Sequence, residues 1–467
     1  MNRKRTSQIL IFNIFVKILK DIDDYVNSMS KRNIVIDPIH GKIELPQWLV
    51  RIKDEAPIRR MMGIKQLGLK AFVDFPGAIH NRYLHSVGTM FLAEKLSSLL
   101  VRKEETNAKP RADLVENLKN NRNSLMAAGF FHDVGHGPFS HVLDFILENK
   151  FKVSHESLAT DIVKKFEQEL EADSIPINQV NNIITKKAKY PFLWEIINGP
   201  LDVDKVDYVL RDSYHVGLRY SFDLDHFFDQ VLVLGGEDNL EKCQLGLANS
   251  SQATACIELF LLLWKNMYTL VYLAESSRIA EKMLEKAILV AIQNNSELVD
   301  EIKEIDKYVE LDESKLTSLL NKSEGFPRNI CERIFKKLDL YVCVFDKNIH
   351  DFDLSNQDFF EELSKQNNED NTSDKISQKL SENVSSEPYP VICDIIRTKT
   401  PKEIFVNERD KEGEPIEIKQ KSKVVNALSE SEVTIKIYFH PEVRKTKKGL
   451  TKEKTIKTKI QKLIDNW

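Results

Sequence analysis

Three histidines and two aspartates lie within the thirteen residues from His132 to Asp144. The adjacent His132 and Asp133 offer an imidazole nitrogen and a carboxylate oxygen, a mixed donor set that suits divalent ions such as manganese, iron, zinc or nickel. His136 follows one helical turn after His132, so we expect it beside the same site. Because the whole chain has only 11 histidines in 467 residues, this density favours a functional site over chance histidines on a helix surface.

The second half of this segment predicts a proton donor. His141 and Asp144 are three residues apart, so on a helix their side chains can form a hydrogen bond. A carboxylate behind an imidazole fixes its tautomer and raises its pKa, which suits proton donation near neutral pH. Gly135, Gly137 and Pro138 would break the helix before this pair and let backbone or substrate approach closely.

Two further segments add charged and polar side chains. Residues 80–86 include His80, Arg82 and His85 at the start of a predicted helix. Residues 201–212 repeat acidic, basic and aromatic residues at helical spacing, and they lack the carboxylate spacing, glycine and closing glutamate of an EF-hand. Residues 63–70 superficially resemble a Walker A loop, but the Gly-Lys-Ser/Thr ending is missing, which disfavours an ATPase.

The elements that must position these residues are mostly helical. From residue 49 to about residue 345, apolar side chains recur at helical spacing and glycine and proline are sparse, as in a helical bundle. Upstream, residues 33–45 predict a short β-hairpin. Residues 1–30 predict an appended amphipathic helix, because Asn13 and Lys17 interrupt the apolar run that a signal peptide needs.

The pattern changes after about residue 340. Short alternating runs predict strands at 340–345, 391–396, 403–406, 416–418 and 433–439. Residues 366–387 are rich in Asn, Ser, Asp and Glu and predict a mobile loop. We therefore expect a mainly α protein with an N-terminal helical extension (1–30), a helical domain (31–345) and a smaller α+β C-terminal lobe (346–467).

Composition limits the possible functions. The 67 Lys and Arg residues against 71 Asp and Glu give a net charge of −4, which disfavours a protein built mainly to bind nucleic acid. The basic tail at 441–467 supports nucleic-acid binding only weakly. No apolar run approaches the ~20 residues that a membrane span needs, so we expect no membrane partner. The five cysteines form no CxxC pair, which predicts a reducing, cytoplasmic location.

Several motifs in order resemble a known family. They are Asp37-Pro-Ile-His-Gly41, Ile64-Lys-Gln-Leu-Gly68, Phe75-Pro-Gly-Ala78, His80-Asn-Arg82, the segment 131–141 and Asp202-Val-Asp-Lys205 with Asp207-Tyr208. This set is similar to the HD-domain deoxynucleoside triphosphate (dNTP) triphosphohydrolases, above all to the animal enzymes that join a sterile-alpha-motif domain to an HD domain. Residues 1–30 are too few for that extra domain. The resemblance covers about 33–290 well and implies an HD-domain helical bundle.

The resemblance also implies roles for individual residues. The metal ligands would be His85, His132, Asp133 and Asp204, holding one divalent transition metal (Mn, Fe, Zn or Ni), with additional Mg possible. Further catalytic positions would be His136, His141, Asp144 and His155, with His141 protonating the departing 5′-oxygen. Arg82, Lys205 and His141 would contact the triphosphate. Gln66, Tyr208 and Asp212 would surround the sugar. Further substrate-binding residues would be Leu67, Lys265 and Tyr272. Tyr208 under the sugar would exclude a 2′-hydroxyl.

The regulatory residues of that family are altered. Arg59 and Met62 stand where the pattern has Gln and Arg, and Asn33 stands where it has Lys, whereas Asp54 is retained. Thr269 occupies the position of an expected substrate-facing His. These departures disfavour activation by a guanine nucleotide and leave another nucleotide effector, a partner protein or constitutive activity open. The resemblance further implies a homo-oligomer, either a dimer or a tetramer.

Three functions remain in competition. The first is a metal-dependent hydrolase that converts a dNTP to a deoxynucleoside and inorganic triphosphate. The second is an HD phosphohydrolase acting on a monophosphate, a cyclic nucleotide or a signalling nucleotide; Arg82 and Lys205 favour a triphosphate over a monophosphate. The third is a nucleotide-sensing or nucleic-acid-binding scaffold, for which the basic tail is the only support.

Overall fold

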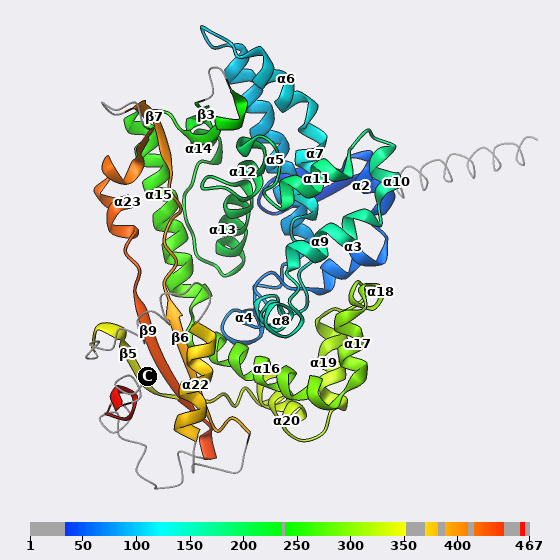
Figure 1. Ribbon diagram of the computed structural model, residues 1–467, viewed down its shortest axis with the longest axis vertical. Coiled ribbons are helices and arrows are strands. Elements are labelled where there is room, and N and C mark those ends of the chain that lie inside the picture. Colours follow the sequence, from blue (N-terminus) through cyan, green and yellow to red (C-terminus); the bar gives the residue numbers. More distant parts are fainter. Residues whose placement is uncertain are drawn as a thin grey trace, which may run out of the picture.

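The computed structural model describes residues 33–235, 239–351, 369–381, 388–409, 415–442 and 458–462. The predicted helix at 1–30 and most of the basic tail lie outside these residues. Helices fill most of the molecule and strands gather in the C-terminal part and at one edge, so the predicted fold class is confirmed (Figure 1).

Three helices form the frame of the N-terminal part. Helix α5 (Arg82–Glu105) begins at Asn81, whose side chain accepts a backbone hydrogen bond of the first turn. It packs along α7 (Arg122–Phe131) and α13 (Val203–His215). The close approach of α13 depends on Gly88, because a Cβ there would lie 2.0 Å from an aspartate oxygen on α13. The start of α5, the end of α7 and the start of α13 are thereby held together.

Shorter helices surround this frame and bury its apolar faces. They are α2 (Gln47–Ile52), α3 (Ala56–Arg60), α4 (Lys70–Val73), α6 (Ala112–Asn120), α8 (His141–Ile146), α9 (His155–Lys164), α10 (Glu167–Glu171), α11 (Ile177–Ile184), α12 (Pro191–Asn198) and α14 (Leu224–Gln230). The core that they share includes Trp48, Phe130 and Phe131, whose rings pack against one another.

A second helical group follows in the chain and makes its own core with α8. Its members are α16 (Glu275–Asn294), α17 (Ser296–Lys303), α18 (Ile305–Tyr308), α19 (Glu313–Lys322) and α20 (Phe326–Glu332). Between the two groups, α15 (Ser251–Met267), continued by the π-helical turn η4 (Tyr268–Tyr272), packs its buried side chains into the first core. Among the described helices, the stretch Ser251–Tyr272 is long and apolar enough to cross a membrane by length and composition. A single such helix is weak evidence for a span, because core helices of soluble proteins pass the same test; 39% of its most apolar window is buried.

Three sheets contain the described strands. The expected hairpin is β1 (Ile34–Asp37) paired with β2 (Gly41–Glu44). A four-stranded sheet has the order β3 (Val231–Leu234), β4 (Gln244–Leu247), β7 (Phe405–Arg409), β8 (Pro415–Glu417). A three-stranded antiparallel sheet has β9 (Val433–Phe439) between β5 (Val342–Asn348) and β6 (Val391–Arg397). The strands predicted after residue 340 are therefore confirmed, with small shifts of their ends.

The predicted mobile loop at 366–387 is wrong for residues 369–381, which form helix α22 (Glu369–Ser381). Its inner face carries Ile376 and Leu380, both buried, together with Ser373 and Ser377. The two serine hydroxyls accept hydrogen bonds from backbone N–H groups of β6. The polar composition hid this helix, because half of its buried stripe consists of hydroxyl side chains that bond to a strand.

The two lobes share structure. The predicted boundary between residues 345 and 346 falls inside β5, and β7 from the C-terminal part pairs in parallel with β4 at Leu247 and Val406. After β6, the chain therefore leaves the three-stranded sheet and adds β7 and β8 to the sheet of β3 and β4.

Candidate metal and nucleotide site

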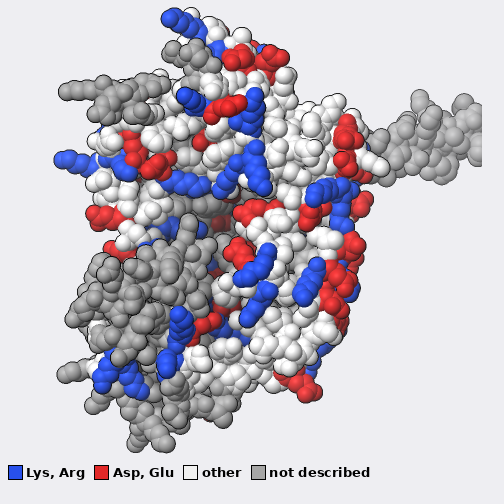
Figure 2. All heavy atoms as spheres, viewed as in Figure 1, with Lys and Arg blue, Asp and Glu red and all other residues white. Residues whose placement is uncertain are grey.

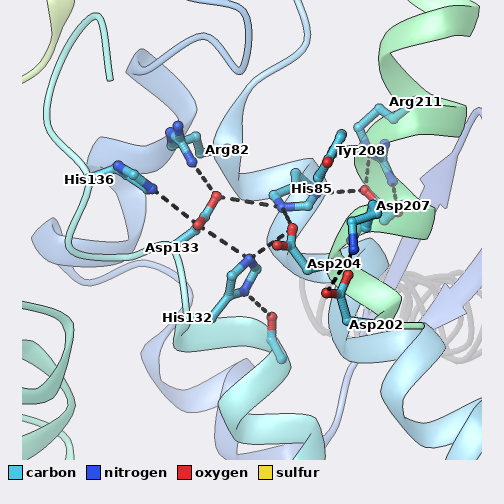
Figure 3. A network of polar contacts seen from close by, with 12 residues as sticks. Arg82, His85, His132, Asp133, His136, Asp202, Asp204, Asp207, Tyr208 and Arg211 are labelled. Atoms are coloured by element: carbon cyan, nitrogen blue, oxygen red, sulfur yellow. Dashed lines mark hydrogen bonds and ion pairs between the residues drawn. The ribbon is translucent and has the colours of Figure 1, made fainter. Parts of the chain in front are cut away.

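Four expected metal ligands converge from three helices (Figure 3). His85 lies in the first turn of α5, His132 and Asp133 follow the end of α7, and Asp204 lies in the first turn of α13. Asp204 Oδ1 is 3.0 Å from His85 Nε2 and 3.4 Å from His132 Nε2. Asp133 Oδ1 lies 3.3 Å from His132 Nε2. The three elements of the helical frame thus bring together residues 119 positions apart in the chain, from 85 to 204.

These residues fit a divalent ion. The Nε2 atoms of His85 and His132 are buried and have no hydrogen-bond partner among the described residues. Together with an oxygen of Asp204 they form a group of donor atoms within 4.8 Å of one another. Burial opposes protonation of His85, but contacts with Asp204 and Asp207 raise its pKa to about 10. The site therefore favours positive charge, and its nitrogen and oxygen donors suit a transition metal.

Hydrogen bonds behind the imidazoles fix their orientation. His85 Nδ1 lies 2.8 Å from Asp207 Oδ2, and His132 Nδ1 lies 2.9 Å from the carbonyl oxygen of Gly129. A donor proton on each Nδ1 leaves the Nε2 lone pair for a metal. This is the arrangement that metal-binding histidines usually show.

Asp207 is held in turn by a buried network that sequence reasoning did not assign to the site. Arg211 donates to both oxygens of Asp207 at 2.8 and 2.9 Å, and to Asp37 at 2.6 Å. His40 Nε2 lies 2.6 Å from Asp207 Oδ1. Burial raises the pKa of Asp207, but the Arg211 charge and the two histidine contacts hold it well below its usual range. The spacing of Asp207 and Arg211, four residues on one helix, was the available signal.

His136, Asp144 and His155 form a second polar group beside the metal ligands. His136 Nδ1 is 2.8 Å from Asp144 Oδ2, its Nε2 is 3.3 Å from Asp133 Oδ1, and its ring stacks on His155 with centroids 3.9 Å apart. Burial lowers the pKa of His136, but Asp144 and Asp133 raise it overall to about 9. Burial and the charge of His136 lower the pKa of His155 to about 4. Three of the four expected additional catalytic residues, His136, Asp144 and His155, are thus adjacent.

His141 departs from the expected geometry. Its Nδ1 lies 4.0 Å from Asp144 Oδ2, which is too long for the predicted hydrogen bond, and its side chain is 79% exposed. The reason is local: Phe139 and Ser140 adopt positive φ values of 56° and 41°, so the chain turns sharply before α8. Asp144 then faces inward to His136, while His141 faces outward.

Cationic side chains flank the metal ligands. Arg82 is buried, donates to Asp133 Oδ2, and donates through Nε to Ser140 Oγ at 2.9 Å. Lys205 lies one residue beyond the ligand Asp204. Its Nζ is 3.4 Å from Asp202 Oδ2 and 3.3 Å from the carbonyl oxygen of Pro200. Of the three expected triphosphate contacts, Arg82 and Lys205 therefore lie next to the candidate ligands, whereas His141 faces outward.

The residues expected around the sugar also gather together. Tyr208 accepts a hydrogen bond from Trp264 at 3.1 Å, and its ring lies 6.1 Å from that of Tyr272. Tyr272 donates to Asp212 Oδ2 at 2.7 Å, and His80, which sequence reasoning left without a role, contacts Asp212 Oδ1 at 2.7 Å. Asp212 is therefore buried with a partner on each oxygen.

Three other expected residues differ in their surroundings. Gln66 has a buried amide oxygen with no hydrogen-bond partner in the described chain, which leaves it able to accept from a ligand. Leu67 is buried in the main apolar core. Lys265 is partly buried on α15, and no hydrogen bond or ion pair joins its side chain to the site within the described residues.

Comparisons with known proteins agree with this geometry. Residues 82–209 match the HD domain family, and residues 241–461 match the HD-associated region. The chain is 34% identical to the deoxynucleoside triphosphate triphosphohydrolase SAMHD1 of Xenopus laevis, over 46% of this chain and 39% of that protein. It is 27% identical to a SAMHD1 homolog of Dictyostelium discoideum, over 70% of this chain and 64% of that protein.

Two solved structures share the fold. A phosphohydrolase from Bacteroides thetaiotaomicron superimposes with a TM-score of 0.64 over 88% of this chain and all of that chain, at 21% identity. A hypothetical protein from Aquifex aeolicus gives a TM-score of 0.66 over 91% of this chain and 99% of that chain, at 21% identity. The chain spans less than two thirds of the curated relatives quoted above. It contains an HD domain and an HD-associated region, and it resembles the SAMHD1-type triphosphohydrolases.

Proposed function

We propose that this HD-domain protein is a metal-dependent hydrolase that converts a dNTP and water to a deoxynucleoside and inorganic triphosphate. The observation that carries the proposal is the convergence of two unpartnered imidazole nitrogens on Asp204, with Arg82 and Lys205 on either side and Tyr208 one turn further along α13. Such a site offers a metal, cations for a polyphosphate, and an aromatic surface for a sugar.

His85, His132, Asp133 and Asp204 would hold one divalent ion, which supplies Lewis acidity and lowers the pKa of a bound water. Arg82 and Lys205 offset the charge on the phosphate oxygens as the bond between the α-phosphorus and the 5′-oxygen breaks. The oxygen of water bonds to that phosphorus, and the electron pair of the broken bond leaves with the 5′-oxygen. His141 would give the leaving oxygen its proton, as the resemblance implies, although it lacks the carboxylate partner that would raise its pKa.

The other site residues position these groups. Asp144 orients His136, whose Nε2 lies next to the ligand Asp133. Tyr208, anchored by Trp264, would pack under the sugar and exclude a 2′-hydroxyl by contact. Gln66 would offer its unpartnered amide oxygen toward the 3′-hydroxyl side, and Asp212, whose oxygens contact His80 and Tyr272, would lie next to the sugar. Leu67 and Tyr272 would contribute to the nucleoside pocket.

Regulation by a guanine nucleotide is not part of the proposal. Asp54, the residue retained from that pattern, pairs with Lys53 at 2.7 Å and lies 3.5 Å from the substituted Arg59 on the surface. A different nucleotide effector fits the proposal. We also propose a homo-oligomer, because Leu259, Leu262 and Leu270 expose one apolar face of α15 and η4. A cytoplasmic location fits the five free cysteines.

The test is to incubate the full chain with each dNTP, singly and mixed, with Mn²⁺ or Mg²⁺, and to separate the products. Deoxynucleoside and intact triphosphate are expected, and His132→Ala should abolish both. Lys419→Ala, which removes a surface ion pair far along the chain, is the matched control and should keep full activity. Release of orthophosphate or pyrophosphate from the same substrates would instead assign a different phosphohydrolase reaction, and no product under any condition would contradict the proposal.

A further inference from the structure

One segment of the C-terminal part reaches the candidate site. Residues 398–404 leave β6 in the three-stranded sheet and enter β7 in the four-stranded sheet (Figure 1). The segment is anchored at both ends: the backbone N–H of Thr398 donates to Glu432 at 2.8 Å, and the carbonyl oxygen of Ile404 accepts from Ile418 at 2.8 Å. Between these anchors it presents two lysines, Lys399 and Lys402.

Lys402 lies against the residues that precede α13. Its Nζ donates to the carbonyl oxygens of Asn198 and Gly199 at 3.3 and 3.1 Å, and it is 4.0 Å from Asp202 Oδ2. The Nζ of Lys205 is 3.5 Å from the same Gly199 oxygen and 3.4 Å from the same Asp202 oxygen. Two ammonium groups, one from each lobe, therefore share two acceptors; Lys402 also reaches the side-chain oxygen of Asn198 at 3.2 Å.

The charge at this position is unbalanced. Asp202 is the one carboxylate that both lysines contact among the described residues, and its other oxygen accepts the backbone N–H of Lys205 as the cap of α13. Burial lowers the pKa of Lys402; Asp202 raises it, and the charges of Lys205 and Lys186 lower it further. An anion placed between the lysines would relieve this repulsion and gain from both charges.

The chemistry of the anion follows from what lies next to it. Figure 3 draws Asp202 close to Asp204 at the start of α13, and the charge of Asp204 acts on both Asp202 and Lys402, so the lysine pair lies near the candidate metal ligands. Lys399 on the same segment adds a third ammonium group, and its Nζ lies 5.8 Å from the ring centre of Tyr268. Arg82 is on the opposite side of the ligand cluster and bonds to Asp133. Cationic side chains on both sides of a metal suit a polyphosphate better than a single phosphate group.

We propose that Lys402 is a further substrate-binding residue, which together with Lys205 holds the outer phosphates of a polyphosphate chain. The inference rests on the proposed function and adds to it a contact from the C-terminal lobe. A dNTP would then bridge the two lobes, with its nucleoside on the helical part and its outer phosphates on both. The competing structural role is simpler: Lys402 would only cap the C-terminal carbonyls of α12.

The test compares Lys402→Ala, Lys402→Arg and the control Lys419→Ala in the full chain loaded with Mn²⁺. Calorimetry measures binding of inorganic tripolyphosphate at two salt concentrations, and binding of a deoxynucleoside serves as the second probe. Lys402→Ala should weaken tripolyphosphate binding roughly three- to tenfold and reduce its salt dependence. Deoxynucleoside binding should not change, Lys402→Arg should restore the affinity, and Lys419→Ala should match the wild type.

The outcomes separate the inference from the proposed function. Equal loss of tripolyphosphate and deoxynucleoside binding in Lys402→Ala would assign Lys402 to capping alone and overturn the inference, as would wild-type affinity for tripolyphosphate. Turnover of dNTPs by the wild-type chain is measured separately. If that turnover is missing while tripolyphosphate binding still depends on Lys402, the proposed reaction fails and the anion site stands.

Discussion

Asp207 gives the sharpest test of how the metal ligands are held. Replacing it by asparagine keeps the size of the side chain but removes the charge that Arg211 and two histidines share. In the variant, one amide oxygen must serve Arg211, His40 and His85, and the amide nitrogen faces at least one of their donors. We expect His85 to lose its fixed orientation.

The magnitude follows from burial. His85, Asp207 and Arg211 have side chains that are 0% exposed, so Asp207→Asn leaves a buried guanidinium with a weakened partner. Breaking such a pair costs about 3–5 kcal/mol of unfolding free energy. Loss of the carboxylate behind a metal-binding histidine costs about 10- to 100-fold in metal affinity, or about 1.4–2.7 kcal/mol.

The assay measures both quantities on the same protein. Urea unfolding of the metal-free chain gives the stability change, and competition with a chelator of known affinity gives the Mn²⁺ dissociation constant. Asp37→Asn is the matched control, because Asp37 bonds to Arg211 and does not contact His85. It should lower stability and leave the metal affinity within about twofold of wild type. Wild-type metal affinity in Asp207→Asn, or equal loss in both variants, would refute this account of ligand positioning.

Three further predictions concern packing, pH and metal. Gly88→Ala places a Cβ 2.0 Å from Asp207 Oδ1, so it should destabilise the chain by about 2–4 kcal/mol and weaken metal binding, seen by urea unfolding and chelator competition. Burial raises the pKa of Glu195 to about 7, so the stability that its protonated form contributes is lost between pH 4.5 and 7. Glu195→Gln should therefore gain up to about 3 kcal/mol over wild type across that window, measured by urea unfolding at several pH values; a constant difference would contradict the reasoning. Chelation should lower the melting temperature, and Mn²⁺ should restore it in the wild type but not in His85→Ala, because the ligand group is then incomplete.

The convergence of the candidate ligands was predictable, because histidine and aspartate in this pattern are the residue types that bind divalent metals. His132 and Asp133 are adjacent, and His85 and Asp204 open helices, so the motif and the helix starts together place the donors. Asp37 and His40 were visible as part of a motif, but nothing in the sequence says that they meet Arg211, which lies 174 positions after Asp37. Such contacts depend on how a hairpin packs on α5 and α13, and spacing within one element carries no information about that.

The pairing of His141 with Asp144 shows the opposite failure. A three-residue spacing allows a hydrogen bond only if both residues lie on the same face of one helix and neither side chain has a stronger partner elsewhere. Ser140 and Phe139 enter α8 through positive φ values, so His141 is the first residue of the helix and is exposed, whereas Asp144 is drawn to His136. The contact between Asp144 and His136 therefore overrides the pairing that helical spacing predicts. In the same way, contacts with β6 stabilise α22, although its polar sequence predicts a loop.

If Lys402 binds the outer phosphates as proposed, the C-terminal lobe is part of the candidate site. Arg278 on α16 pairs with the buried Asp394 of β6 at 2.6 Å, and Lys286 on the same helix pairs with Asp374 of α22 at 2.6 Å. Burial raises the pKa of Asp394, but the Arg278 charge lowers it overall, so the pair stays ionised. These contacts fix β6, and the segment that carries Lys402 begins where β6 ends. A nucleotide that holds Lys402 would therefore stabilise the seating of the whole lobe, and a lobe displaced from α16 would lose its contact with the nucleotide.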